Sequence, residues 1–260
     1  MKFCVVEIKT QTATFRNPEF QNFHKSLLLP PPTTMVGFAG AAMGLSPKAS
    51  QEFFNQEAFK IGVFGKSQGI AKDLWKYNDF KNGSVILKEI LFINEFILVY
   101  GTENKEIINT LQTAFYNPTY ALTLGNSDSL AKIIKISLIS ETTESYHLGH
   151  CLVEGNIIQD VKDNYDNGLD FSIYTSSEPI AYDLPTKFAY QSEYGIRNVI
   201  ERKTLSFIGE TMKLNHPKPG ILYQNKFIPI FNYQNHPKTK ITPKATQPTT
   251  SDKQGQYQLF

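Results

Sequence analysis

The first residues of the chain alternate between apolar and polar side chains. Within residues 2–10, Cys4, Val6 and Ile8 fall on one face, a spacing that predicts a half-buried β-strand with the thiol inside. Shorter apolar runs rich in β-branched and aromatic residues predict further strands at residues 59–64, 84–101 and 131–139. The middle run is long, and Asn94-Glu95 within it predicts a turn between two strands.

Two segments show helical spacing instead. In residues 33–45, Gly37, Gly40, Ala41 and Gly44 make one stripe of small residues. Each glycine costs a helix roughly 1 kcal/mol against alanine, so close approach to another backbone is the expected benefit. Either Thr33 or Thr34 is suited to cap the start of this helix. A second helix is predicted over residues 103–115, with Thr102 and Glu103 suited to its start and its apolar side chains one helical turn apart, at Ile107, Ile108, Leu111 and Phe115.

The predicted order is therefore strand, helix, strand, strand, helix, strand. That order is typical of the α+β ferredoxin-like (RRM-like) fold, an antiparallel sheet backed by two helices. We expect this domain to span residues 1–140. RNA-recognition modules use the fold often, but it hosts many other functions as well.

Beyond residue 140 the periodic pattern weakens. Residues 141–185 are expected to be partly loop, and strands are predicted at 186–190, 199–208 and 220–230, the last with a hairpin turn at Gln224-Asn225. We therefore expect a small β-rich C-terminal extension over residues 141–233. Residues 234–260 are rich in Pro, Thr, Gln and Lys and have few core-forming residues, which predicts a disordered tail.

Composition limits the kind of function. Hydrophobic residues make up 41% of the chain, enough for a packed core, while the net charge is only +2. Any electrostatic binding site must therefore be local. Two cysteines imply no disulfide framework, and the N-terminal segment lacks the pattern of a secretory signal. No apolar run reaches membrane-spanning length, so we expect a cytoplasmic protein without membrane contact.

Familiar catalytic motifs are missing from the sequence. It contains no phosphate-binding P-loop, no dinucleotide fingerprint and no nucleophile elbow, and nothing suggests a cofactor. The segment His147-Leu148-Gly149-His150-Cys151 is the one metal-like cluster. It lacks the second ligand pair that a structural zinc site needs, which favours ordinary loop residues. The sequence does not exclude an RNA-cleaving site assembled from His, Lys and Tyr residues that are far apart in the chain.

Cations and rings alternate in residues 65–83. The cations are Lys66, Lys72, Lys76 and Lys81, and Trp75 is the single tryptophan of the chain. Cations neutralise phosphates and rings stack on unpaired bases. The alternative is a solvated hairpin whose rings pack on the core, so Trp75 is either a core anchor or a stacking platform.

Two loops complete the candidate RNA-binding surface. Residues 15–34 offer Arg16 and Lys25 and end in the Thr33-Thr34 turn, where a helix N-terminus presents backbone N–H groups to an anion. This loop could equally be a structural crossover that merely leads into the helix. The third candidate is the polar segment Gly125, Asn126 and Ser127.

Three blocks of sequence resemble one known family. Phe15-Arg16 with LLLPPPTTMVGFAGAAMGL (27–45), KDLWKY with VILKEILFINEFILVYG (72–77 and 85–101), and NPTYALTLGNSDSLAKI (117–133) resemble, in order and spacing, the N-terminal, middle and late blocks of the CRISPR-associated Cas-five family. The resemblance covers residues 1–140 and weakens beyond them. The three blocks are most similar to those of type I-B systems.

The resemblance implies a ferredoxin-like domain with a projecting thumb between its middle strands, at about residues 65–84. It also implies a non-catalytic subunit of a type I surveillance (Cascade) complex that caps the 5′ handle of the guide crRNA. The partners would be the backbone subunits, the large subunit and, through the complex, target DNA. A weak net charge fits a subunit that shares its RNA with more basic partners. One branch of the family cleaves precursor crRNA, so a metal-independent endoribonuclease is the alternative, although no catalytic His-Lys-Tyr set is apparent in the sequence.

Overall fold

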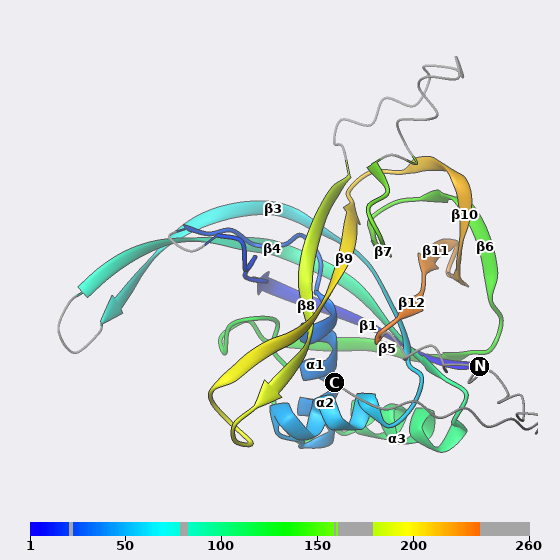
Figure 1. The fold of residues 1–260 in the computed structure, drawn as a ribbon, viewed down its shortest axis with the longest axis horizontal. Helices are drawn as coiled ribbons and strands as arrows, with labels where there is room; N and C mark the ends of the chain where they lie inside the picture. The colour runs from blue at the N-terminus through cyan, green and yellow to red at the C-terminus, as the bar shows by residue number, and fades with distance from the viewer. Residues whose placement is uncertain (21–22, 79–82, 159, 161–178, 235–260) are drawn as a thin grey trace, which may run out of the picture.

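The computed structural model describes residues 1–20, 23–78, 83–158, 160 and 179–234 (Figure 1). Within them the fold is mixed α/β, rich in strands and poor in helices. The elements in chain order are β1 (Lys2–Ala13), β2 (Phe23–His24), α1 (Pro32–Met43), α2 (Pro47–Asn55), β3 (Lys60–Asn78), β4 (Gly83–Thr102), α3 (Lys105–Tyr116), β5 (Ala131–Ile139), β6 (Thr143–Leu148), β7 (Cys151–Glu154), β8 (Ile180–Tyr190), β9 (Arg197–Ile208), β10 (Met212–Tyr223), β11 (Lys226–Pro229) and β12 (Phe231–Asn232).

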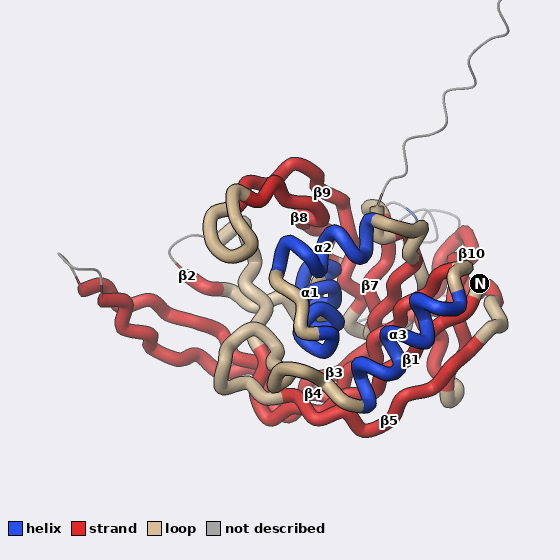
Figure 2. Tube along the Cα trace, turned by 90° about the horizontal axis from the view of Figure 1, so that it is seen from below, coloured by secondary structure: helices blue, strands red, loops and turns tan. Residues whose placement is uncertain are grey.

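A large, mainly antiparallel sheet forms the centre of the described part of the molecule. Its strands lie in the order β5-β1-β4-β3-β7-β9-β8, with β2 joined to β4 and β12 joined to β3. The three helices α1, α2 and α3 lie together on one face of this sheet (Figure 2). The main core lies between them and includes Val6, Val63, Leu98 and Ile108, all fully buried. Cys4 is 0% exposed in this core, which confirms it as an inward residue of the first strand.

A second, three-stranded sheet covers part of the other face. Its order is β11-β10-β6. Ile221 and Ile228 of this sheet pack against Phe3, Val5 and Val99 of the main sheet in a smaller core. The main sheet is therefore covered by helices on one side and partly by the small sheet on the other.

Strands β3 and β4 form one long hairpin. They pair without a change of register from Lys60↔Gly101 to Asn78↔Gly83, and their far half projects from the body as an arm (Figure 1). The turn predicted at Asn94-Glu95 is wrong, because both residues lie inside β4 and pair with Ser67 and Lys66 of β3. The local irregularity is Ile93, whose φ of 49° lies in the left-handed region, although the register on both sides of it is the same.

The small-residue helix begins earlier than expected. Its N-cap is Pro31, which offers no side-chain hydrogen bond, and Thr33 and Thr34 lie inside the first turn of α1. The capping role predicted for these threonines is therefore wrong, because the three prolines set the extended entry and the first turn. In the other predicted helix, Asn104 is the cap, and its Oδ1 accepts from the N–H of Glu106.

The second half of the chain is richer in strands than expected. Strands β7, β9 and β8 continue the main sheet, although only Phe64 and Cys151 pair β3 with β7. The predicted turn at Gln224-Asn225 is confirmed, since both residues have positive φ (47° and 60°) between the paired Tyr223 and Lys226. The predicted disordered tail lies outside the described residues from 235 onward. No helix in the described part of the chain is long and apolar enough to cross a membrane.

Candidate nucleic-acid interface

The arm separates its side chains onto two faces. Because neighbouring residues of a strand point to opposite sides, Trp75 lies on one face and Lys72 and Lys76 lie on the other. The sequence suggested one mixed patch of cations and rings, but strand geometry divides it in two. Lys81 lies outside the described residues.

Lys88 organises the face that carries Trp75. Its side chain extends over the indole, with Nζ 4.1 Å from the ring centroid, and the ammonium donates a hydrogen bond to Asn126 Oδ1. Burial lowers the pKa of Lys88, while the carboxylates of Asp128 and Asp73 act in the opposite direction. The residue as a whole is only 6% exposed, and its ammonium lies beside an aromatic ring, an amide and nearby carboxylates.

Trp75 remains 44% exposed although Lys88 covers part of it. A core anchor would be buried, whereas an exposed ring whose position is held by a cation can receive a stacked base. This geometry favours the stacking platform over the core anchor.

The segment around Asn126 is clamped to the end of β1. Gly125 has φ 96°, and a Cβ built there would come within 1.8 Å of the Thr14 carbonyl oxygen, so only glycine fits this conformation. The Thr14 N–H donates to Leu124 O at 3.2 Å. These contacts bring Asn126 to Lys88, 38 residues earlier in the chain.

Strand β2 adds a histidine, and Arg16 lies close enough to act on its charge. His24 pairs with Lys88 across the β2–β4 ladder. Burial lowers the pKa of His24, and the charges of Arg16 and Lys88 lower it further, so the imidazole is neutral near pH 7. We call Arg16, His24, Trp75, Lys88 and Asn126 the arm-base cluster.

The opposite face of the arm is cationic and apolar. Lys72 Nζ lies 5.8 Å from the ring centroid of Phe23. Leu74 and Val85 are 69% and 66% exposed. Lys25 belongs to the same loop as Phe23, and its Nζ lies 5.3 Å from the Phe20 ring centroid.

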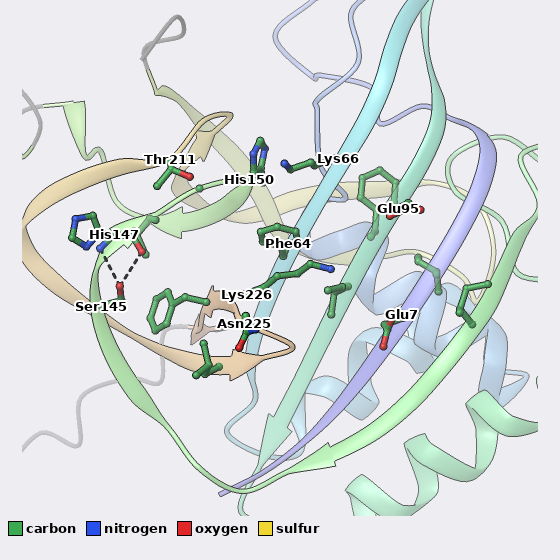
Figure 3. A pocket seen from close by; sticks show the side chains of 18 of the residues that line it. Glu7, Phe64, Lys66, Glu95, Ser145, His147, His150, Thr211, Asn225 and Lys226 are labelled. Atoms are coloured by element: carbon green, nitrogen blue, oxygen red, sulfur yellow. Dashed lines mark hydrogen bonds between the residues drawn. The ribbon is translucent and has the colours of Figure 1, made fainter. Parts of the chain in front are cut away.

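The remaining predicted residues lie in other places. Thr33 and Thr34 line a small cavity of about 160 Å³ that also includes Arg197 and Tyr190 of the β8–β9 hairpin. Lys66 lines a larger cavity of about 610 Å³ between the two sheets (Figure 3). Ser127 follows Asn126 in the clamped segment. The twelve predicted residues therefore do not form one site.

Sequence reasoning missed Lys88 and His24. Lys88 stands inside the apolar run VILKEILF, and a lone cation in a strand that must be half buried was the available signal. His24 gave no such signal, because only the pairing of β2 with β4 brings it to Lys88.

The metal-like histidine segment does not form a metal site. His147 and His150 both line the larger cavity, but Cys151 is fully buried in β7, where burial raises its pKa. Across the described ranges, no group of three or more His, Cys, Asp or Glu residues could hold a metal ion.

Comparison with known proteins identifies the family. A family profile described as CRISPR-associated protein (Cas_Cas5) matches residues 3–200. The match spans well over half of the chain, so the chain belongs to this family. No curated protein matches the chain in sequence.

Among the solved structures that match the chain are three at low identity. A chain of a structure titled "CRISPR RNA-guided surveillance complex" has a TM-score of 0.47 and 10% identity, covering 83% of this chain and 91% of that one. A CRISPR protein from Archaeoglobus fulgidus has a TM-score of 0.42 and 11% identity, covering 89% and 100%. A structure titled "Crystal structure of Cas protein" has a TM-score of 0.34 and 15% identity. The match covers 49% of this chain and 58% of that one.

Proposed function

We propose that the chain is a non-catalytic RNA-binding subunit of a type I CRISPR surveillance complex and caps the 5′ handle of the guide crRNA. The observation that carries this proposal is the arm-base cluster in a chain of the Cas_Cas5 family. There an exposed indole is positioned by a buried ammonium beside Arg16 and His24. Cations for phosphates and a ring for a splayed base are what recognition of single-stranded RNA requires.

The fold supports a matching assignment of architecture. The elements β1, α1, β3, β4, α3 and β5 follow one another in the ferredoxin-like order, and their strands lie side by side as β5-β1-β4-β3. We assign residues 1–140 to a ferredoxin-like RNA-binding domain whose thumb is the arm, and residues 141–233 to a β-rich extension. The backbone and large subunits would contact the surfaces around this domain, and target DNA would reach it through the complex.

The test measures retention of guide RNA by the assembled complex. Trp75→Ala removes the stacking surface, and we expect binding to weaken by about 1–3 kcal/mol with an unchanged melting temperature. Tyr116→Ala is the matched control, because Tyr116 is 66% exposed at the end of α3. Unaltered RNA affinity together with a lowered melting temperature would show that Trp75 serves only the fold.

One observation favours the alternative, a metal-independent endoribonuclease. A neutral His24 beside Lys88 has the protonation state of a general base that could take the proton of a 2′-OH. We expect no cleavage of labelled cognate repeat RNA by the purified chain, with or without chelator. A single specific product that is absent with the His24→Ala variant would show that the chain is an endoribonuclease.

A further inference from the structure

The larger of the two cavities described above, which Lys66 lines, lies away from the arm-base cluster. It measures about 610 Å³, within the range of small-ligand sites of about 300–1,000 Å³, and lies between the outer face of the main sheet and the small sheet β11-β10-β6 (Figure 3). Its lining residues among those the structure describes include none of the five members of that cluster. The proposed function therefore leaves this cavity unassigned.

The carboxylates of the cavity wall are already engaged. Glu95 forms an ion pair with Lys9 at 2.5 Å, and Glu7 accepts a hydrogen bond from Gln224 Nε2 at 2.8 Å. Lys66 and Lys226 line the same wall. Glu95 engages Lys9, which leaves the ammonium groups of Lys66 and Lys226 as the cations of this wall that an anionic ligand could meet.

His150 is held at the rim in an uncommon conformation. Its φ of 53° is left-handed, which is sparsely populated by residues other than glycine and often associated with functional sites. Its carbonyl accepts from the Gly65 N–H at 2.8 Å, next to Lys66. The preceding Gly149 has no room for a side chain, because a Cβ there would meet Thr211 Cα at 2.9 Å.

These contacts place an imidazole against an ammonium. Figure 3 shows the side chains of His150 and Lys66 pointing toward each other at the rim of the cavity. Burial lowers the pKa of His150, and the charge of Lys66 lowers it further, while Glu210 acts in the opposite direction. One N–H donor from β3 and one from the turn between β6 and β7 thus converge, an arrangement suited to an anion.

An aromatic surface lies beside this pair. The ring of Phe64 is 5.9 Å from the His150 ring and 5.6 Å from Lys226 Nζ, measured to ring centroids. Phe64 is only partly buried. The cavity therefore combines a ring, which can stack on a base, with a pair of donors suited to a phosphate.

We propose that this inter-sheet cavity binds a single nucleotide. Its phosphate lies between Lys66 and His150, and its base lies against Phe64 beside Lys226. The nucleotide is either free in solution or the phosphorylated 5′ end of an RNA strand, and only the second case rests on the proposed function.

The test uses the full-length chain and calorimetric titration with two probes. The probes are adenosine 5′-monophosphate and a five-nucleotide RNA, the RNA with and without a 5′ phosphate. The variant Lys226→Glu reverses the charge beside Phe64, and Lys105→Glu on α3 is the control with the same charge change. His150→Gly removes the imidazole while keeping the left-handed backbone at no steric cost, so it distinguishes loss of ligand from loss of fold.

We expect adenosine 5′-monophosphate or the 5′-phosphorylated RNA to bind about tenfold more weakly to Lys226→Glu, which loses a charged contact, and to His150→Gly, which loses a hydrogen-bond donor. Binding to Lys105→Glu should be unchanged. If the mononucleotide responds, the ligand is free, and if only the phosphorylated RNA responds, the ligand is a strand end. If neither probe distinguishes these variants from the wild type, the cavity is not a nucleotide site. RNA binding that still weakens in Trp75→Ala would then leave the proposed function standing.

Discussion

At the scale of single residues, the proposed RNA site is built around a cation in an apolar strand. Lys88 is 6% exposed and contacts both the Trp75 ring and the Asn126 amide. A buried ammonium is costly and is rarely needed for stability alone. Its contact with the exposed Trp75 ring therefore supports the RNA-binding role that we propose for the site.

Lys88→Met tests that interpretation. Methionine keeps the aliphatic length and removes the charge, so we expect the free energy of unfolding to stay the same or rise, while affinity for guide RNA falls. Chemical denaturation and RNA binding are measured on the same preparation. A protein that loses stability and keeps its RNA affinity would show that the ammonium is structural.

Gly125 is the second residue whose type the site requires. Gly125→Ala should destabilise the fold by about 1–3 kcal/mol, because alanine at φ 96° is strained and its Cβ would meet the Thr14 carbonyl at 1.8 Å. Gly69→Ala is the control, since nothing lies within 4 Å of a Cβ there. Equal denaturation midpoints for the two variants would contradict the clamp.

At the scale of elements, the glycines of α1 serve different purposes. Gly40 lies against α2, where an added Cβ would be 1.8 Å from Ser50 Oγ and 2.6 Å from Ser50 Cβ. Gly37 faces open space, and Gly44 ends the helix with φ 74°. The small-residue stripe is thus required for close packing at one position and for helix termination at another.

That difference predicts opposite effects on stability. Gly40→Ala should lower the free energy of unfolding by about 1–3 kcal/mol through overpacking. Gly37→Ala should leave it unchanged or raise it by up to about 1 kcal/mol, because alanine favours the helix. Thermal denaturation of both variants checks this pair, and destabilisation of similar size in both would mean that the stripe packs along its whole length.

At the scale of the whole molecule, the net charge is only +2, so any RNA binding depends on local groups of cations. The arm carries Lys72 and Lys76 on the face opposite Trp75, so an RNA strand that follows the arm would meet phosphate-binding groups on one face and the stacking ring on the other. The inter-sheet cavity holds further cations at a separate place. The cations are thus divided among surfaces that lie on different elements.

The double variant of Lys72→Ala and Lys76→Ala tests the arm's share of that energy. Each lost phosphate contact should reduce the slope of log affinity against log salt concentration by about 0.7 for a single strand, with the fold intact. RNA binding by the assembled complex across a salt series measures the slope. An unchanged slope and affinity would remove this face of the arm from the interface, and Lys105→Ala on α3 controls for loss of charge elsewhere.

The elements themselves were predictable, because alternation and helical spacing record which face of each element is buried. Cys4 within its strand, the helix around Ile108 and Leu111, and the turn at Gln224-Asn225 were all read from local pattern. Local pattern failed at Asn94-Glu95 and at Thr33 and Thr34, where polar residues with turn or capping preferences lie inside elements that pairing and proline geometry determine.

The site, in contrast, depended on long-range pairing. Trp75 and the lysines beside it are close in sequence, and the sequence suggested one patch, yet strand alternation places them on opposite faces. Lys88 and Asn126 are 38 residues apart, and only the clamp of Gly125 on Thr14 joins them. Side-chain spacing along a chain determines which residues share a face of one element. The packing of sheets and loops decides which faces meet. The sequence by itself therefore determined which types of side chain were available, and only the tertiary structure decided that Trp75, Lys88 and Asn126 lie together.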